Sequence, residues 1–502
     1  MMDTRKIIAT VEQLSGADLP VYLVGGAVRD RLMNRDSHDL DFVMEGGTAR
    51  LARRVANALQ ADFYVLDMER DTSRVIYTDP EGEKICLDFA RARSNDLDGD
   101  LRARDFSINA IAIRLGDEGT LIDPCGGVRD IHNKVLRACG PTSLEDDPAR
   151  VLRVVRLAVG IDFRIEETTI AQARQAAVLI PRISAERRRD ELVRMLEGDR
   201  AALCVRLLER LGGLEYVLPE LLALKGLEQP SPHVLDGWEH TLELVDRLET
   251  LVQALTTPVK EESPAGLILG AAQATLGRYQ PQFRAHLAQG MPNGRGLLVA
   301  LKLAALYHDT GKATTASRDD AGQLHFYRHE EVSARLVAER ARALAFSSEE
   351  VECCEIIVRE HMRIHQLVAA SPQPSPRSIY RFFRATGEAG VDVCMVSLAD
   401  TWATYSHTLP QEHWLAELQV CRAILEARWE KDEEIVHPPR LLDGRELMAV
   451  FDLKPGPLIG ALLEAIREAQ AAGDVRGKEE ALVVARKWLE QNKDGEHVEP
   501  TR

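Results

Sequence analysis

Hydrophobic and polar positions follow two different periods along this chain of 502 residues. Up to about residue 140, short apolar runs rich in β-branched and aromatic residues are typical of strands. The predicted strands span residues 21–26, 38–44, 62–66, 73–78, 84–90 and 108–115. Beyond residue 141, apolar residues recur at spacings of three and four, which indicates helices. We therefore expect an α+β fold, in which a head with a mixed sheet is followed by a long all-α body.

The length of the chain predicts three or four domains, at a usual size of about 150 residues each. The expected parts are a head over 1–140, a helical neck over 141–225, a histidine-containing domain over 226–410 and a helical C-terminal region over 411–502. Pro-containing stretches predict loops at 256–266 and 371–378, and the polar residues 493–502 predict a frayed tail.

Composition adds three restrictions. No run approaches the ~18 apolar residues of a membrane span, and the N-terminus lacks the pattern of a signal peptide, so we expect a cytoplasmic protein without a membrane partner. The eight cysteines contain no CxxC pair and are expected to be reduced. The net charge of −16 argues against a general nucleic-acid coat. Arginines nevertheless concentrate between residues 150 and 194, which indicates a local basic groove. The sequence gives no indication of the oligomeric state.

A glycine turn near the N-terminus is the first candidate for chemistry. The predicted strand VYLVGG ends at Gly25-Gly26, and AVRDRLM continues at helical period. A strand, a tight turn and a helix start leave backbone N–H groups free for an anion. Arg29 is expected to project from the first helical turn toward the same place.

Two carboxylates follow in the next predicted strand, HDLDFV. Asp39 and Asp41 are two residues apart, so a strand places both on one face. Two acids on one face repel each other unless a cation neutralises them. Mg²⁺ prefers carboxylate and phosphate oxygens, which makes the pair a candidate magnesium site for chemistry on a triphosphate.

Further motifs continue in a fixed order. ARDFSINA, DPCGGVRD, EDDPARVLRVVRLA and ISAERRRDEL occupy residues 103–110, 123–130, 145–158 and 183–192. With Gly-Gly-x-x-Arg-Asp (25–30) and Asp-x-Asp (39–41), this set resembles the bacterial tRNA nucleotidyltransferase and poly(A) polymerase family of the polymerase β-like superfamily. So many ordered motifs over about 170 residues argue against a chance match.

The resemblance implies an enzyme that adds C, C and A to the 3′ end of tRNA from CTP and ATP, without a nucleic-acid template and with release of pyrophosphate. Asp39 and Asp41 would be catalytic and would hold Mg²⁺. The residues implied in nucleotide binding are Gly25, Gly26, Arg29, Asp30, Arg104, Asp105, Asn109, Asp147, Arg150, Arg153 and Arg156.

Base selection has a chemical logic in this motif set. Asp147, Arg150, Arg153 and Arg156 are spaced by three and are expected on one helix face. Asp147 only accepts hydrogen bonds, whereas Arg150 only donates them. Cytosine and adenine both offer an amino donor beside a ring-nitrogen acceptor, so this pair suits both and rejects uracil and guanine. Arg153 and Arg156 would face the triphosphate or the RNA backbone.

Several positions depart from the family pattern. Ala103 replaces the first arginine of Arg-Arg-Asp, which leaves Arg104 to act alone or with Arg102; Cys125 replaces an aromatic residue. Asp146 and Leu157 occupy the usual Glu and Phe positions. Asp88 is a further acid of the head, and we expect it either to complete a carboxylate triad or to pair with Arg91 or Arg93.

The helical body contains an ordered series of histidines and aspartates: His240, His308-Asp309, His329, His361, His365 and Asp400. This order resembles the HD-domain metal phosphohydrolases. It implies that His240, His308, Asp309 and Asp400 bind a divalent transition metal or Mg²⁺. The implied second activity is phosphohydrolysis, such as trimming of cyclic phosphate ends of RNA.

Two classes of alternative stay open. A poly(A) polymerase, or an enzyme that adds only A or only CC, would share the head motifs; the acidic polar tail speaks against poly(A) synthesis. The chain could also be an HD phosphohydrolase with an inactive RNA-binding head. The presence of Asp39, Asp41 and the glycine turn speaks against that alternative.

Overall fold

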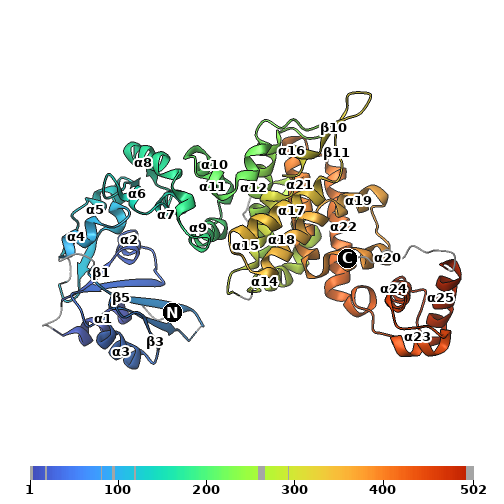
Figure 1. Cartoon of the computed structure of the whole chain (residues 1–502), viewed down its shortest axis with the longest axis horizontal. Coiled ribbons are helices and arrows are strands. Elements are labelled where there is room, and N and C mark those ends of the chain that lie inside the picture. The colour runs from blue at the N-terminus through green and yellow to red at the C-terminus, as the bar shows by residue number, and fades with distance from the viewer. Residues whose placement is uncertain are drawn as a thin grey trace. The chain divides into compact units, whose positions relative to one another are not determined.

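The computed structural model describes residues 4–16, 20–80, 82–92, 96–117, 120–257, 266–291 and 293–492 (Figure 1). They form two compact units, one of Met1–Met195 with Cys204–Val217, the other of Leu196–Leu203 with Leu218–Arg502. The predicted tail at 493–502, and residues 258–265 of the predicted loop, lie outside the described residues. The expected four-part division of the chain stays a prediction.

The first unit is built on a mixed sheet, which confirms the expected α+β head. Within the described residues seven strands pair in the order β3-β4-β5-β2-β1-β6-β7. Their bounds are β1 Val21–Val24, β2 Asp39–Met44, β3 Asp62–Asp67, β4 Thr72–Thr78, β5 Lys84–Arg91, β6 Ala112–Arg114 and β7 Leu121–Ile122. β2 and β5 run parallel, and the other pairs are antiparallel.

Five of the six predicted strands are confirmed, and the sixth is shorter than expected. The stretch 108–115 gives only the short strand β6, preceded by the 3-10 turn η1 (Ser107–Asn109). The reason is that Ser107 bonds outside the sheet. Its N–H donates to Arg137 O at 2.9 Å, and its hydroxyl donates to Asp130 Oδ2 at 2.7 Å.

Helices cover one face of the sheet, and the candidate catalytic carboxylates lie on the opposite face. Helices α1 (Thr4–Ser15), α2 (Gly26–Leu32) and α3 (Thr48–Leu59) pack against the apolar face, and Figure 1 shows α1 and α3 on the same side. Phe42 and Phe89 stack in this core with ring centroids 5.0 Å apart. Because side chains alternate along a strand, the residues between these two and their apolar neighbours face the opposite side.

Helices complete the first unit. They are α4 Leu97–Arg102, α5 Gly127–His132, α6 Ser143–Asp146, α7 Ala149–Gly160, α8 Glu167–Ala177, α9 Ala185–Glu197, α10 Ala201–Arg210 and α11 Leu214–Val217, with 3-10 turn η2 Ile180–Arg182 and the parallel pair β8 Val135–Leu136 and β9 Arg164–Ile165. Gly127 allows α5 to approach η1, since a Cβ there would lie 2.0 Å from Ser107 O.

The second unit is helical, as expected. Its helices are α12 Gly237–Thr256, α13 Leu267–Leu276, α14 Gln280–Leu287, α15 Leu297–Tyr307, α16 Lys312–Thr315, α17 His329–Ala343, α18 Ser348–Glu360, α19 Arg363–Ala370, α20 Pro376–Thr386, α21 Gly390–Tyr405, α22 Gln411–Glu430, α23 Gly444–Phe451, α24 Pro457–Ala471 and α25 Lys478–Gln491. Shorter elements are the 3-10 turns η3 Pro219–Leu224, η4 Gly277–Tyr279, η5 Gly387–Ala389 and η6 Ser406–Thr408, the π-helical turn η7 Asp432–Val436, and the hairpin β10 Ala316–Arg318 with β11 Leu324–Phe326.

Packing in this unit centres on α15 and α21, in which nearly every residue is buried. α12 packs against α21, and α15 packs against α12, α17 and α18. The predicted loop 371–378 is shorter than expected because Pro376 begins α20, with the Ser375 side chain as its N-cap. Proline suits the first helical position, where its missing N–H is no loss. The eight cysteines are free, as expected. Among the described residues, no helix is long and apolar enough to cross a membrane.

Candidate active site and metal centre

The exposed side of the head sheet opens into a cavity of about 980 Å³, here called the head cavity. It is lined by Asp41, Val43, Asp67, Glu69, Arg70, Thr72, Asp88, Ala90, Arg91, Ala92, Asp100, Arg104, Asp147 and Arg187. Three of the predicted site residues, Asp41, Arg104 and Asp147, therefore meet in one cavity although they come from three separate segments of the sequence.

The carboxylate pair lies as the strand period predicts. Asp39 and Asp41 of β2 alternate with buried Leu40 and Phe42, so both acids are on the face opposite the core. Burial raises the pKa of Asp41; Arg104 opposes this shift, and the charges of Asp88 and Asp39 add to it. Such a set of carboxylates fits a hard divalent cation, because the cation would offset the repulsion that Asp88 and Asp39 add to the effect of burial on Asp41.

Asp88 lies directly beside Asp41, since β2 and β5 pair in parallel register at these two residues. The partner of Asp88 is Arg74 rather than the expected Arg91, and Arg93, the other expected partner, lies outside the described residues. Arg74, opposite it on β4, donates from Nε and Nη2 to the two carboxylate oxygens at 2.7 Å each. The strand order decides this pairing, because Arg74 projects from the neighbouring strand toward the same face.

The glycine turn is shaped by close approach. Gly25 has φ +74° and ψ −138°, a conformation that residues with a Cβ avoid. A Cβ at Gly25 would lie 2.9 Å from Arg104 Nη1 and 3.2 Å from Asp41 Oδ2. Gly26 begins α2, and the Arg29 guanidinium returns to within 3.6 Å of a Cβ built there. The turn thus lies against Asp41 and Arg104, at the head cavity.

Several residues that are predicted to bind nucleotide form hydrogen bonds with one another. Arg29 donates to the Asp30 carboxylate at 2.8 and 3.0 Å and to Asn109 Oδ1 at 2.9 Å. Asn109 donates to Asp105 Oδ1 at 3.1 Å, and Arg153 donates to Asp105 Oδ2 at 3.0 Å. Because these groups satisfy one another, the network fixes the segment that carries Arg104.

The network continues to a residue that the sequence did not single out. Arg153 and Arg156 both donate to Glu191 of α9, at 3.0 and 2.8 Å, and Glu191 is buried. Burial favours a raised pKa for Asp105, but Arg153 outweighs it, so this carboxyl has a lowered pKa. Within the chain, Arg153 and Arg156 contact carboxylates, and their contact with the triphosphate or the RNA backbone stays a prediction.

Asp147 and Arg150 are not neighbours on one helix face, which corrects that expectation. α7 begins at Ala149, and Asp147 precedes it in extended backbone. Its carboxylate accepts from Arg187 Nη2 at 2.9 and 2.8 Å, and this pair lines the head cavity. Pro148 explains the difference, because the residue before a proline is driven out of helical backbone.

Arg150 makes contacts of a different kind. Its guanidinium donates to the backbone carbonyls of Ala103, Arg104 and Ser143 at 3.0 to 3.2 Å and to the Ser143 hydroxyl at 2.6 Å. Arg150 therefore holds the backbone at Arg104. Arg102 instead pairs with Asp98 at 2.7 Å on the surface, so Arg104 is the arginine of this motif that lines the cavity.

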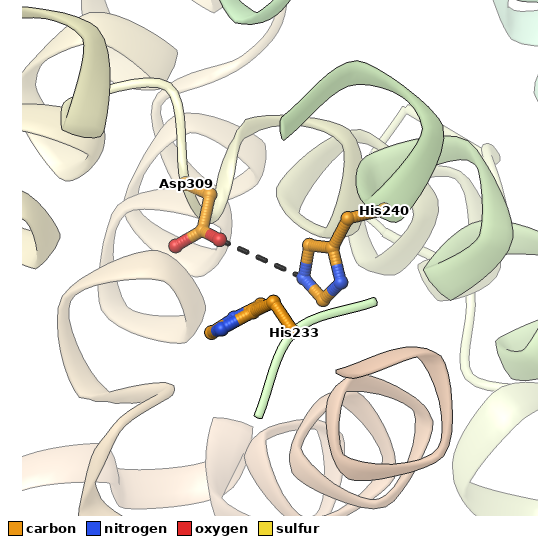
Figure 2. Close-up of side chains that lie close together, drawn as sticks. All are labelled: His233, His240 and Asp309. Carbon is orange, nitrogen blue, oxygen red and sulfur yellow. Dashed lines mark ion pairs between the residues drawn. The ribbon is translucent and has the colours of Figure 1, made fainter. Parts of the chain in front are cut away.

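The second unit brings the predicted histidines and aspartates together in a buried cluster. The histidine cluster consists of His233, His240, His308, Asp309, His329, His361 and Asp400. His308 and Asp309 directly follow α15, His240 lies on α12 and Asp400 on α21. Potential ligand atoms gather within 4.8 Å of one another in three sets: His240, His308 and Asp400; Asp309, His329 and His361; and His233, His240 and Asp309 (Figure 2 shows the third).

The protonation pattern of the cluster fits a cation. The Nδ1 atoms of His308, His329 and His361 each bond a carbonyl three residues earlier, at 2.8, 2.9 and 2.6 Å. A carbonyl only accepts, so Nδ1 carries a proton in each ring, and Nε2 of a neutral ring presents a lone pair. At His308 burial lowers the pKa, but Asp309, 3.1 Å from its Nε2, outweighs burial and raises it. His361 Nε2 is buried without a hydrogen-bond partner, and its nearest carboxylate oxygen, on Asp309, is 3.9 Å away. A divalent cation satisfies such converging lone pairs.

The charges in the histidine cluster also favour a bound divalent cation. Burial favours a raised pKa for Asp309, but His308 and Lys312 outweigh it and hold the pKa well below its ordinary value. Burial, with the neighbouring His308 and His329, lowers the pKa of His361 to about 3. A neutral imidazole beside ionised carboxylates is the ligand set that borderline divalent metals prefer.

His365 has a different role from the other histidines of the series. Its Nε2 contacts Asp400 Oδ2 at 3.0 Å, and its Nδ1 lies 3.3 Å from Glu417 Oε1. Burial opposes protonation, but Glu417 and Asp400 raise the pKa of His365 to about 10. Both ring nitrogens therefore carry protons at neutral pH, and His365 supports Asp400 without offering a lone pair. Sequence order alone gave no sign of Glu417.

Three family models match parts of this chain. Residues 21–137 match the family described as Poly A polymerase head domain, residues 162–224 match the probable RNA and SrmB-binding site of polymerase A, and residues 285–400 match the HD domain. The fold and the head therefore define an enzyme of the nucleotidyltransferase class.

Relatives of known activity narrow this class. The A-adding tRNA nucleotidyltransferase of Deinococcus radiodurans is 33% identical over 475 residues, 93% of this chain and 95% of that protein. The CC-adding tRNA nucleotidyltransferase of Thermus thermophilus is 32% identical over 494 residues, 94% of this chain and 95% of that protein. The chain belongs to the tRNA nucleotidyltransferase family.

Solved structures show the same fold at lower identity. A CCA-adding enzyme with ATP aligns with a TM-score of 0.61 and 20% identity, covering 97% of this chain and 96% of that chain. The Thermotoga maritima CCA-adding enzyme complexed with tRNA aligns with a TM-score of 0.55 and 20% identity, covering 97% and 95%. The expected head, helical body and HD domain agree with this fold.

Proposed function

We propose that the head transfers CMP or AMP from CTP or ATP to the 3′ end of tRNA. The supporting observation is the head cavity, which joins Asp41 of β2 and Asp88 of β5 to Arg104 and to the Asp147–Arg187 pair; Asp39 is not among the residues that line it. In the reaction the 3′-oxygen of the RNA forms a bond to the α-phosphorus. The bond between that phosphorus and the bridging oxygen breaks, pyrophosphate leaves, and the hydroxyl proton is released.

Some of these residues would contact the substrate or its metal ion, and others keep the contacting residues in position. Asp39 and Asp41 would bind Mg²⁺, which supplies charge neutralisation for the triphosphate when bound. The Gly25-Gly26 turn leaves room for Arg104 beside Asp41, where a guanidinium can bind a phosphate oxygen. The network from Arg29 to Glu191, with Arg150, keeps this segment in place.

Base selection is assigned to the cavity edge. The Asp147 carboxylate would accept from the exocyclic amino group of cytosine or adenine, and an arginine would donate to the ring nitrogen. Arg150 is the arginine that the family pattern implies, but Arg187 is the one that contacts Asp147 inside the cavity. We expect Arg187→Ala and Asp147→Ala to lose discrimination against UTP and GTP. Unchanged discrimination in both variants would contradict this assignment.

One observation favours a partial reaction, CC or A, over complete CCA addition. Four relatives that align over more than 90% of this chain are named A-adding or CC-adding tRNA nucleotidyltransferases. The Multifunctional CCA protein of Aromatoleum aromaticum, 32% identical, aligns over 70% of this chain and 77% of its own length.

Three tRNA transcripts separate these outcomes: one ending before CCA, one after C and one after CC, each incubated with one labelled nucleotide at a time. A CC-adding enzyme would add C to the transcripts that end before CCA or after C, and would add nothing to the transcript that ends after CC. An A-adding enzyme would add A only to the transcript that ends after CC. Long A tracts would indicate poly(A) synthesis. Asp41→Asn is the control for the head, and the absence of C or A incorporation by the unmodified enzyme would overturn the proposal.

A second candidate activity belongs to the histidine cluster, whose unpartnered His361 Nε2 favours a bound divalent metal. Such a metal would supply a water nucleophile for phosphate ester hydrolysis. The assay measures phosphate release from 2′,3′-cyclic nucleotides by the metal-loaded enzyme. His308→Ala should abolish release, and equal release by this variant would refute the assignment. Asp41→Asn should leave this activity unchanged.

A further inference from the structure

His233 has the features of a metal-presenting histidine, although it lies outside the series His240, His308-Asp309 and Asp400. It belongs to the segment between η3 and α12, and its side chain is partly buried. Its Nδ1 lies 3.1 Å from the carbonyl oxygen of Pro230, three residues earlier. This is the arrangement found at His308, His329 and His361, and it leaves the Nε2 lone pair free for a cation.

The position of the ring agrees with this arrangement. One ligand atom each from His233, His240 and Asp309 lies within 4.8 Å of the other two, and Figure 2 shows the three side chains converging from different segments. The rings of His233 and His240 meet edge to face, with centroids 5.2 Å apart. His240 Nε2 is 3.6 Å from Asp309 Oδ2.

The segment that carries His233 is tied to the cluster by a separate contact. Gln229 Oε1 accepts from Lys312 Nζ at 2.8 Å, and the same ammonium lies 2.6 Å from Asp309 Oδ2. At the other side, Val234 N–H donates to Thr404 O on α21 at 3.3 Å. These bonds hold His233 beside Asp309 before any ion binds, which reduces the entropy cost of binding.

We propose that His233 is an additional metal ligand of the HD domain and binds a divalent transition ion together with His240 and Asp309. The inference rests on the metal site proposed above. Two imidazoles and one carboxylate favour ions such as Co²⁺ or Zn²⁺ over Mg²⁺, which prefers oxygen ligands. His365 is the counter-example within the same unit, because both of its nitrogens face carboxylates and none is left for a metal.

The test measures Co²⁺ binding to the full chain after removal of metal with a chelator. A chromophoric chelator competes for Co²⁺ and gives the affinity, and the visible absorption of bound Co²⁺ reports its coordination. Replacing a supporting residue around a metal typically weakens affinity by about 10–100-fold, so loss of a direct ligand in His233→Ala should cost at least that and alter the spectrum. His407→Ala, at an exposed histidine of the same unit, should leave both unchanged.

Further variants separate the possible failures. His233→Gln keeps a side chain of similar length without a strong ligand, and serves if the alanine variant folds poorly by circular dichroism. Affinity and spectrum unchanged in both His233 variants, with binding lost in Asp309→Asn, would overturn this inference and leave the metal site standing. Absence of Co²⁺ binding by the unmodified chain would overturn both.

Discussion

Gly25→Ala tests whether the glycine turn shapes the head site. The backbone at Gly25 has φ +74°, and holding a residue with a Cβ in such a sparsely populated region costs about 1–3 kcal/mol. The new Cβ would also lie 2.9 Å from Arg104 Nη1 and 3.2 Å from Asp41 Oδ2. Asp41 is held by the sheet, so we expect the end of the Arg104 side chain to move.

The expected loss of activity follows from that displacement. A shift of about 1 Å in a positioning group can cost 10²-fold in rate, so kcat/KM for nucleotide incorporation into a tRNA transcript should fall by about 100-fold. Thermal unfolding of the first unit should shift down by about 2–4 °C for each kcal/mol lost. Moving Arg104 away should also raise the pKa of Asp41 further, since that shift, caused mainly by burial, is opposed by Arg104.

Gly160→Ala is the matched control in the same unit. Gly160 is the exposed last residue of α7, and nothing lies within 4 Å of a Cβ built there. Activity should stay unchanged, and stability should rise slightly because alanine is the better helix former. The reasoning is refuted if Gly25→Ala keeps the kcat/KM and the unfolding temperature of the unmodified enzyme.

Three further predictions concern stability. Arg150→Met should lower the free energy of unfolding by about 1.5–3 kcal/mol, because charged donors to three backbone carbonyls are lost; urea denaturation without a shift would contradict this. The pKa of Asp105 is lower in the folded state than in the unfolded state. The ionised carboxylate therefore contributes to the free energy of unfolding above about pH 4, and this contribution is lost as the pH falls through the lowered pKa. The stability gap between the unmodified enzyme and Asp105→Asn should therefore narrow below about pH 4 in urea titrations, and a constant gap would refute it. Chelation of a metal present at 100 times its Kd should remove about 2.7 kcal/mol from the second unit, seen as a lower unfolding temperature that His308→Ala does not show.

Local periodicity explains what could be predicted. Asp39 and Asp41 share a face because a strand repeats every two residues, and that is independent of the rest of the chain. The series from His240 to Asp400 was also visible in order, and the structure brings its members together. The roles of these residues in catalysis and metal binding stay predictions.

The wrong predictions, on the partner of Asp88 and on the position of Asp147, have their cause in pairings between distant segments. Asp88 bonds Arg74 because β4 lies next to β5, and the order of strands is not written in any one of them. Spacing placed Asp147 on a helix with Arg150, but Pro148 delays the helix and the packing of α9 supplies Arg187. Periodicity has no information on partners 40 residues away.

The sequence by itself determined the division into an α+β head and a helical body, the family, and the residue types at both sites. Those features depend on local backbone preference and on ordered motifs. Only the tertiary structure decided that Arg153 and Arg156 bond buried Glu191, that His365 bonds Asp400 and Glu417, and that His233 lies beside Asp309. The physical reason is that a buried polar group must find its partner wherever packing places one, and packing depends on the whole chain.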